Sequence, residues 1–212
     1  MTIDSAARPR LVVATRSTHK LRELRELLHP EHADLLSLDD LGIGDDVPET
    51  GETFETNARQ KARAYARLTR LPVLADDSGL EVDALGGGPG VRTRRYAGED
   101  ATDDDNNRRL LAALEGLSAD RRGARYVCVL GLAIPGSDGR LIWHLTRGTC
   151  RGRIATGPRG SDGFGYDPIF EPASEAPGGR TLGLWSAAEK NRISQRARAA
   201  RRMAPILAEL GF

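Results

Sequence analysis

Long apolar runs and clustered cysteines are both missing from this chain of 212 residues. No apolar run approaches the roughly 20 residues that cross a bilayer, and the N-terminus has no apolar signal core. We therefore expect a soluble, cytoplasmic protein with no membrane partner. The two cysteines, Cys128 and Cys150, have no second pair nearby, which argues against a zinc knuckle or a disulfide framework. We predict that each is a small buried residue.

The chain also lacks an excess of charge of either sign. Its 31 basic and 30 acidic residues give a formal net charge of +1, which provides no general attraction to nucleic acid or anionic lipid. With 39% apolar residues, the composition is that of a globular protein. At this length we predict a single domain, residues 1–212, in which residues 1–9 form a disordered N-terminal tail.

Lysine is scarce, because only Lys20, Lys61 and Lys190 occur among the 31 basic residues. Arginine is used almost everywhere else, so each lysine is a candidate for a role that requires a compact ammonium group. Chance retention of three lysines is the alternative interpretation.

Hydrophobic periodicity predicts alternating strands and helices in the first third of the chain. Residues 10–15 are typical of a buried strand, and the leucines that follow have helical spacing behind a cap at Ser17 or Thr18. Residues 49–68 predict a polar loop and a helix, and residues 71–77 predict a second strand that ends at two carboxylates. Because ligands collect beyond the C-terminal ends of strands in open α/β sheets, both strands can deliver the loops that follow them to one cleft.

The rest of the chain predicts further helices and a long hairpin. Residues 102–117 predict a helix whose acidic first turn is interpreted as structural. Residues 124–152 predict two long antiparallel strands, and a Ser-x-x-Glu capping box opens a basic helix over residues 186–205. The predicted fold class is α/β, with a mixed central sheet flanked by helices and an antiparallel hairpin extension.

Asp76 and Asp77 stand side by side at the predicted end of the second strand. Like charges repel unless a cation offsets them, and where a strand ends its side chains no longer alternate, so both carboxylates can approach one Mg²⁺. A solvated turn is the alternative interpretation. Glu49 adds a further carboxylate, and Lys20 and Lys61 add cations beside helix starts, which together favour a site for a nucleoside triphosphate.

Two further observations narrow the chemistry. Phe164 and Tyr166, in a glycine-rich loop, offer rings on which a base can stack, while metal and lysine suit the phosphates. The chain has no Cys–His pair and its four histidines do not cluster, so covalent catalysis has little support. Metal-assisted attack by water remains.

Five segments carry a family resemblance: VVATRSTHK, ETGETFETNARQKA, LADDSGLEVDALGGGPG, GFGYDPIF and AEKNRISQR. In this order, from about residue 10 to about residue 200, they resemble the inosine triphosphatase family, whose members are also called XTP/dITP diphosphatases or non-standard purine NTP pyrophosphatases. The resemblance implies an inosine triphosphatase-like fold and a homodimeric, Mg²⁺-dependent hydrolase. Such an enzyme converts ITP, dITP and XTP to the monophosphate and pyrophosphate, and so removes deaminated purines from the nucleotide pool.

The resemblance also implies roles for individual residues. Asp77 matches the catalytic aspartate, which accepts a proton and binds the metal, while Glu49 matches the other metal carboxylate and Asp76 supports the same metal site. The residues implied to bind substrate are Thr15, Arg16, Ser17, Thr18, His19 and Lys20 in a triphosphate loop, Asn57 and Lys61 on a second phosphate-binding helix, Ser78 beside the metal, and Phe164, Gly165, Tyr166, Asp167, Lys190, Gln195 and Arg196 around the base. All three lysines therefore coincide with ligand positions of the family.

Base selectivity depends on hydrogen bonding at purine position 6. Oxygen there is an acceptor, so a donor from Lys190 or Arg196 suits hypoxanthine and xanthine, whereas the amino group of adenine leaves that donor unpaired. Guanine shares the oxygen, so its rejection requires another feature. The chain departs from the family at Ser17, usually asparagine, at Gln195, usually histidine, and at Arg92, commonly tyrosine, and these departures bear on base selectivity.

Two alternative functions remain open. A pyrophosphatase for modified pyrimidine or other nucleotides shares the phosphate chemistry and differs in its base pocket. A non-catalytic nucleic-acid-binding protein is suggested by the arginines between residues 192 and 202, but the near-neutral net charge argues against a stable nucleic-acid partner.

Overall fold

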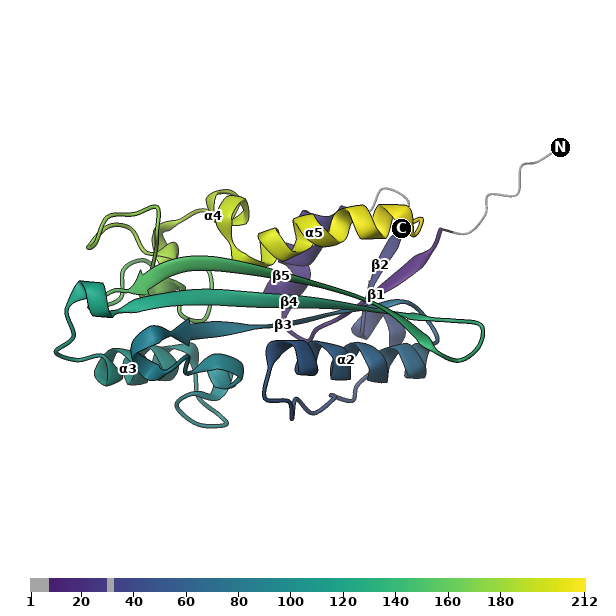
Figure 1. Cartoon of the computed structure of the whole chain (residues 1–212), viewed down its shortest axis with the longest axis horizontal. Helices are drawn as coiled ribbons and strands as arrows, with labels where there is room; N and C mark the ends of the chain where they lie inside the picture. Colours follow the sequence, from purple (N-terminus) through teal and green to yellow (C-terminus); the bar gives the residue numbers. More distant parts are fainter. Residues whose placement is uncertain (1–7, 30–32) are drawn as a thin grey trace.

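The computed structural model describes residues 8–29 and 33–212, so most of the expected N-terminal tail lies outside the described residues. Within them, one mixed sheet has the strand order β2-β1-β3-β4-β5-β6 (Figure 1). Its strands are β1 (Arg10–Ala14), β2 (Asp34–Ser37), β3 (Val73–Val82), β4 (Gly123–Pro135), β5 (Leu141–Ile154) and β6 (Phe170–Pro172). The α-helices are α1 (Thr18–Leu28), α2 (Phe54–Thr69), α3 (Asp103–Ala113), α4 (Ala187–Ile193) and α5 (Gln195–Glu209). The predicted fold class is confirmed.

β1 has two parallel neighbours, β2 and β3, and from β3 onward the strands are antiparallel. The predicted hairpin is present as β4 and β5. Cys128 on β4 and Cys150 on β5 are buried, and neither is disulfide-bonded in the described part of the chain. No helix within the described residues is long and apolar enough to span a membrane.

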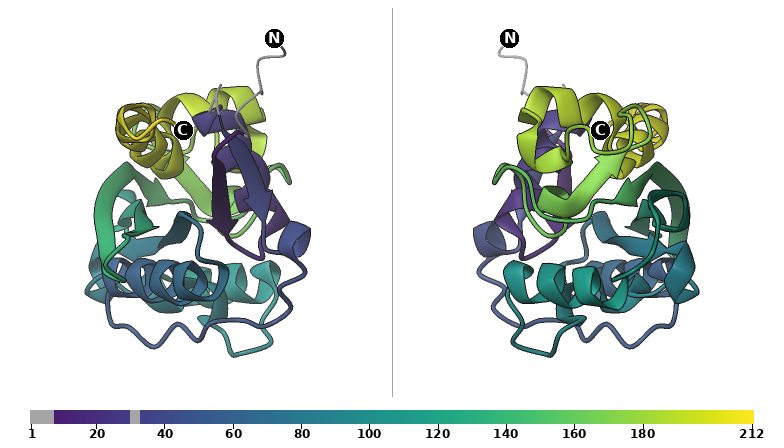
Figure 2. Two further views of the ribbon diagram at one scale, coloured as in Figure 1. Left: turned by 90° about the vertical axis from the view of Figure 1, so that its right-hand side faces the viewer. Right: turned by 90° about the vertical axis from the view of Figure 1, so that its left-hand side faces the viewer.

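Helices cover both faces of the sheet. Leu24 of α1 packs with Ala199 and Met203 of α5 against one face, whereas Ala62 and Tyr65 of α2 pack against the other. Figure 2 shows α4 and α5 on one side of the sheet and α2 and α3 on the opposite side. The chain therefore leaves β1 through α1 on one face and reaches β3 through α2 on the other. The C-terminal end of β1 is thus a switch point, where open α/β sheets bind ligands.

The sequence predicts that the second strand ends at the acidic doublet, Asp76 and Asp77. In the structure the doublet lies in the middle of that strand, β3. β1 stops opposite Ala75, but β3 continues to Val82 because β4 pairs with it throughout. Side chains therefore keep alternating: those of Asp76 and Ser78 contact groups of α1 and α5, and that of Asp77 lies toward α2. The expected strand end is wrong, and the two carboxylates leave β3 on opposite faces.

The predicted C-terminal helix is broken into α4 and α5. Its capping box is present, with the Ser186 hydroxyl accepting from the Glu189 N–H. Ser194 makes the break, because its extended backbone ends α4 while its hydroxyl oxygen accepts from the Ala197 N–H and caps α5. α5 then continues through Pro205 and does not end there. Sequence periodicity missed the break because both halves have helical spacing.

Candidate active site

The candidate active site lies along the edge of β3, just beyond the last residue of β1. No strand of the described chain pairs with this edge after Ala75, so the backbone groups of β3 there bond to side chains and to loops instead of to a neighbouring strand. The carbonyl oxygen of Asp76 accepts a hydrogen bond from Lys61 Nζ at 2.6 Å. A ligand that lies across this edge reaches side chains from both faces of the sheet.

On the α2 face, Asp77 and Glu49 share Lys61. The Nζ atom of Lys61 lies 2.6 Å from Glu49 Oε1 and 3.9 Å from Asp77 Oδ1. Asp77 Oδ2 is buried and has no hydrogen-bond partner among the described residues. Burial outweighs the attraction of Lys61 and raises the pKa of Asp77 to about 6. An additional cation would therefore stabilise the ionised form of this carboxylate.

Asn57 holds the loop that carries Glu49. Its Oδ1 accepts from the Gly51 N–H at 2.7 Å, and Asn57 is buried one turn before Lys61 on α2, on the face that the sequence predicted for both. A Cβ on Gly51 would lie 2.7 Å from this oxygen, so glycine is needed for so close an approach. The amide of Asn57 thus positions a carboxylate that it does not itself contact.

On the opposite face, donors surround Asp76. Lys20 Nζ lies 2.7 Å from Oδ1, the Ser78 hydroxyl donates to the same oxygen at 2.9 Å, and Arg196 Nε donates to Oδ2 at 2.9 Å. Burial by itself raises a carboxyl pKa, but Arg196 and Lys20 more than offset it and hold the pKa of Asp76 well below its usual range. Asp76 is therefore an ionised anchor for two cations, on the face away from Asp77.

Glu23 extends this network to the base-binding residues that the sequence predicted. Arg196 Nη1 donates to Glu23 Oε2, and Lys190 Nζ lies 3.2 Å from Glu23 Oε1 and 2.7 Å from Asp167 Oδ2. Burial raises the pKa of Glu23, but Arg196 and Lys190 outweigh it, so the net shift is downward. Three carboxylates thus balance three cations in one buried group. We name this group the buried charge cluster: Lys20, Glu23, Asp76, Asp167, Lys190 and Arg196.

Phe164 covers part of this cluster. Its ring centroid lies 4.4 Å from Lys190 Nζ and 5.8 Å from Arg196 Cζ. The same ring stacks on the imidazole of His19. Tyr166 had been expected to offer a second stacking surface, but its ring is buried in the core and its hydroxyl donates to a backbone carbonyl. Of the two predicted rings, Phe164 therefore faces the site.

We name the glycine-rich loop that carries Phe164 and Tyr166 the aromatic loop. Helix α3 holds its backbone in place. The Gly165 N–H donates to Asp103 Oδ2 at 2.6 Å, and Asn107 Nδ2 donates to the Gly165 carbonyl at 3.1 Å. Gly165 has φ +64°, which glycine adopts readily. The buried carboxylate of Asp167 accepts from the Phe164 N–H at 3.0 Å. The acidic first turn of α3 thus fixes a loop as well as complementing its own helix.

Side chains of the loop after β1 contact two different parts of the chain. The Ser17 hydroxyl caps α1 by accepting from the Lys20 N–H at 3.3 Å, and the Ser17 N–H donates to Thr15 Oγ1 at 3.2 Å. Arg16 instead turns to the chain between β2 and α2, where its Nε donates to Asp46 Oδ1 at 2.9 Å. Its guanidinium anchors that chain segment, and the role in substrate binding that the resemblance implies for Arg16 stays a prediction. Thr18 is exposed at the first position of α1.

Gln195 is buried at the start of α5, next to Arg196. Its Oε1 has no hydrogen-bond partner among the described residues. Gly148 of β5 permits this close packing, since a Cβ there would lie 2.0 Å from the Gln195 carbonyl oxygen. The departure from histidine therefore places a neutral amide, with an open acceptor, in the interior.

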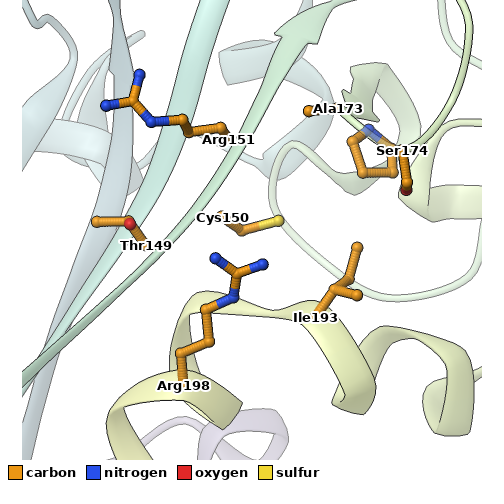
Figure 3. A pocket seen from close by; sticks show the side chains of 8 residues that line it. Thr149, Cys150, Arg151, Ala173, Ser174, Ile193 and Arg198 are labelled. Carbon is orange, nitrogen blue, oxygen red and sulfur yellow. The ribbon is translucent and has the colours of Figure 1, made fainter.

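A separate pocket of about 170 Å³ lies between β5, the chain after β6 and the α4–α5 junction (Figure 3). Its lining consists of Thr149, Cys150, Arg151, Pro172, Ala173, Ser174, Ile193 and Arg198. None of the site residues predicted from the sequence is among these described lining residues. Burial raises the pKa of Cys150 to about 11, so its thiol is protonated at neutral pH. No carboxylate is among the described lining residues of this pocket, in contrast to the candidate active site at the edge of β3, which we name the edge site.

The α2 side of the edge has the donors that a hard cation requires. Among the described residues, no three His, Cys, Asp or Glu side chains form a preassembled metal site. Glu49 and Asp77, with its unpaired buried oxygen, fit a cation that takes its remaining ligands from water and substrate. Mg²⁺ is bound in this way, by one or two carboxylates together with phosphate oxygens.

The sequence of the chain matches a known protein family. Residues 11–206 match the Ham1 family. The chain belongs to the Ham1 family. This membership confirms the resemblance carried by the five motifs of the sequence.

Curated Ham1 relatives match over most of their length. The dITP/XTP pyrophosphatase of Syntrophobacter fumaroxidans is 49% identical, over 89% of this chain and 78% of that protein. The dITP/XTP pyrophosphatase of Bacillus subtilis is 41% identical, over 92% of this chain and 96% of that protein. A solved Ham1 protein from Coxiella burnetii superposes with a TM-score of 0.84 at 39% identity, over 95% of this chain and 99% of that one.

Sequence reasoning missed three residues that hold the site of this Ham1 chain together. Glu23 could have been found from its spacing, because it lies three residues after Lys20 on one predicted helix. Asp103 and Asn107 gave a weaker signal, since acids and amides at a helix start are common without any tertiary contact. Their partner, Gly165, is far away in the sequence.

Proposed function

We propose that this chain is a Mg²⁺-dependent pyrophosphatase that hydrolyses ITP, dITP and XTP to the monophosphate and pyrophosphate. Its family membership makes it a hydrolase of triphosphate phosphoanhydride bonds. One observation carries the finer proposal: the edge of β3 has Asp77 and Glu49 on one face and the buried charge cluster under Phe164 on the other. A ligand across this edge meets groups for phosphate and for base at once.

On the phosphate side, Lys20 and Lys61 are the proposed ligands of the triphosphate oxygens. Their ammonium groups flank the edge of β3, where they pair with Asp76 and Glu49. Asp77 is the proposed acceptor of the proton from the attacking water, because its buried Oδ2 has no hydrogen-bond partner among the described residues and its Oδ1 lies 3.9 Å from the ammonium group of Lys61. Mg²⁺ held by Asp77 and Glu49 would neutralise charge on the triphosphate.

On the base side, Lys190 and Arg196 are the proposed donors to the oxygen at purine position 6. Both are buried, and Glu23 fixes their spacing. A buried donor left without an acceptor is costly, so a base with an amino group at this position is disfavoured. The ring of Phe164 supplies the stacking surface.

A substrate panel tests the proposal. Purified protein with Mg²⁺ should release pyrophosphate from ITP and XTP faster than from GTP, ATP or dCTP, and should leave the nucleoside monophosphate. Intact ITP and XTP at high enzyme concentration would contradict the proposal. Faster release from pyrimidine triphosphates would favour the alternative pyrophosphatase function.

The homodimer implied by the family resemblance is a further part of the proposal. Light scattering of the purified protein should give about twice the chain mass of 22.9 kDa. A monomer at micromolar concentration would contradict it. Cytoplasmic location stays a prediction from the sequence.

A further inference from the structure

His19 differs from its neighbours in the loop after β1, because its side chain lies against the aromatic loop. Its imidazole stacks on the Phe164 ring, with centroids 5.2 Å apart and planes inclined by 20°. His19 is exposed and makes no hydrogen bond or ion pair within residues 8–29 and 33–212. The stack is therefore the specific contact of this side chain.

One face of α1 carries both His19 and Glu23. Residues four apart on a helix share a face, and Glu23 contacts Lys190 and Arg196, the two donors proposed for the purine oxygen. Lys20, the next residue along, instead points to the acidic doublet of β3. In the first turn of α1, Lys20 thus lies toward the proposed phosphate side and His19 toward the proposed base side.

We propose that His19 is the second wall of the base site, so that the purine ring binds between its imidazole and the ring of Phe164. This inference rests on the proposed function and adds a residue that the resemblance assigned to the triphosphate loop. At carbon contact distances of about 3.5 Å, a base between two rings holds them about 7 Å apart. We expect the His19 side chain to move and widen the gap between the two rings, because it is exposed. Phe164 is held in place by Asp167 and, through Gly165, by α3.

The two walls and the buried donors have different effects on binding. Every purine has a π-face, so stacking on His19 and Phe164 increases affinity without distinguishing one base from another. Lys190 and Arg196 meet the edge of the ring and make the distinction. Loss of His19 therefore weakens binding of all purine nucleotides by the same factor and leaves their order of preference unchanged.

The test compares His19→Ala with His19→Phe, which keeps an aromatic ring. Base–aromatic stacking corresponds to about 5- to 150-fold in binding. His19→Ala should raise KM for ITP about tenfold with little change in kcat, and should weaken binding of inosine monophosphate by a similar factor in calorimetry. His19→Phe should stay within about threefold of wild type in both measurements. Arg22→Ala, on the exposed side of the same helix, is the matched control and should behave as wild type.

Ribose 5-phosphate, which has no base, separates stacking from phosphate binding. Its affinity should be the same in wild type and His19→Ala. Equal loss of ribose 5-phosphate and inosine monophosphate would overturn the proposal, and so would His19→Phe behaving like His19→Ala, or an unchanged or lower KM in His19→Ala. If wild type binds inosine monophosphate but hydrolyses no purine triphosphate, the proposed function fails while the binding comparison still decides the role of His19. If wild type does not bind inosine monophosphate, both proposals fail.

Discussion

Replacing Glu23 by glutamine removes one of the three carboxylates that balance three cations in the buried charge cluster. Glu23 is 7% exposed and contacts Arg196 and Lys190. Glutamine keeps the shape but leaves a net positive charge in the interior. Removing one partner of a buried ion pair costs about 3–5 kcal/mol. Because Arg196 keeps Asp76 and Lys190 keeps Asp167, we expect the low end of that range, about 3 kcal/mol.

Thermal unfolding measures this loss directly. For a domain of this size, 1 kcal/mol corresponds to about 2–4 °C, so Glu23→Gln should lower Tm by about 6–12 °C. Glu26→Gln, an exposed position on the same helix, is the control and should stay within about 2 °C of wild type. Equal Tm values for the two variants would refute the conclusion that charge balance stabilises the cluster.

The pH dependence of the same variant gives a second check. The folded-state pKa of Glu23 lies below its ordinary value of 4.5, since Arg196 and Lys190 outweigh its burial. A lowered pKa contributes stability that is complete above the unfolded value and is lost as pH falls toward the folded one. The difference in Tm between wild type and Glu23→Gln should therefore be constant above about pH 5.5 and shrink below about pH 4.5. A difference that grows in acid would contradict this sign.

Three further predictions concern the edge site and the aromatic loop. Asp77→Asn should lower the rate of pyrophosphate release from ITP by about 10² or more, because it removes the proposed base and metal ligand; near-normal turnover would point to another carboxylate. Removing divalent metal with EDTA should abolish release and added Mg²⁺ should restore it, whereas activity that persists in EDTA would exclude the metal requirement. Asp103→Ala should speed hydrogen exchange at the Gly165 amide and raise KM for ITP about fivefold. Asp103→Asn keeps an acceptor and should preserve both values, so exchange that is equal in the two variants would rule out this anchor.

The first strand, the cap at Ser17 and the hairpin could be predicted from the sequence, because each depends on local pattern. Hydrophobic runs, helical spacing and cap residues specify such elements within a few positions. The membership of the family was equally accessible, since its motifs are contiguous.

The arrangement of the acidic doublet could not be predicted, because it depends on a distant strand. β3 continues past Asp77 because β4 pairs with it up to Val82. No local sequence pattern predicts this pairing. The burial of Tyr166 has a similar cause, since its ring completes a core formed by residues far away in sequence. Glu23 is a charged residue on a leucine-rich helix, and burial of such a residue depends on partners from α4 and α5.

Because Asp76 and Asp77 leave β3 on opposite faces, the two tasks of the site are encoded in separate stretches of the chain. The phosphate-side carboxylates Glu49 and Asp77 belong to the loop before α2 and to β3, whereas Phe164, Lys190 and Arg196 on the base side come from the aromatic loop, α4 and α5. The strand backbone is the boundary between them. Exchange of residues 157–200 between two Ham1 proteins should therefore transfer the preference for a base and leave the metal requirement of the recipient intact. Such modularity would let base preference diverge within the family while the hydrolytic chemistry stays the same.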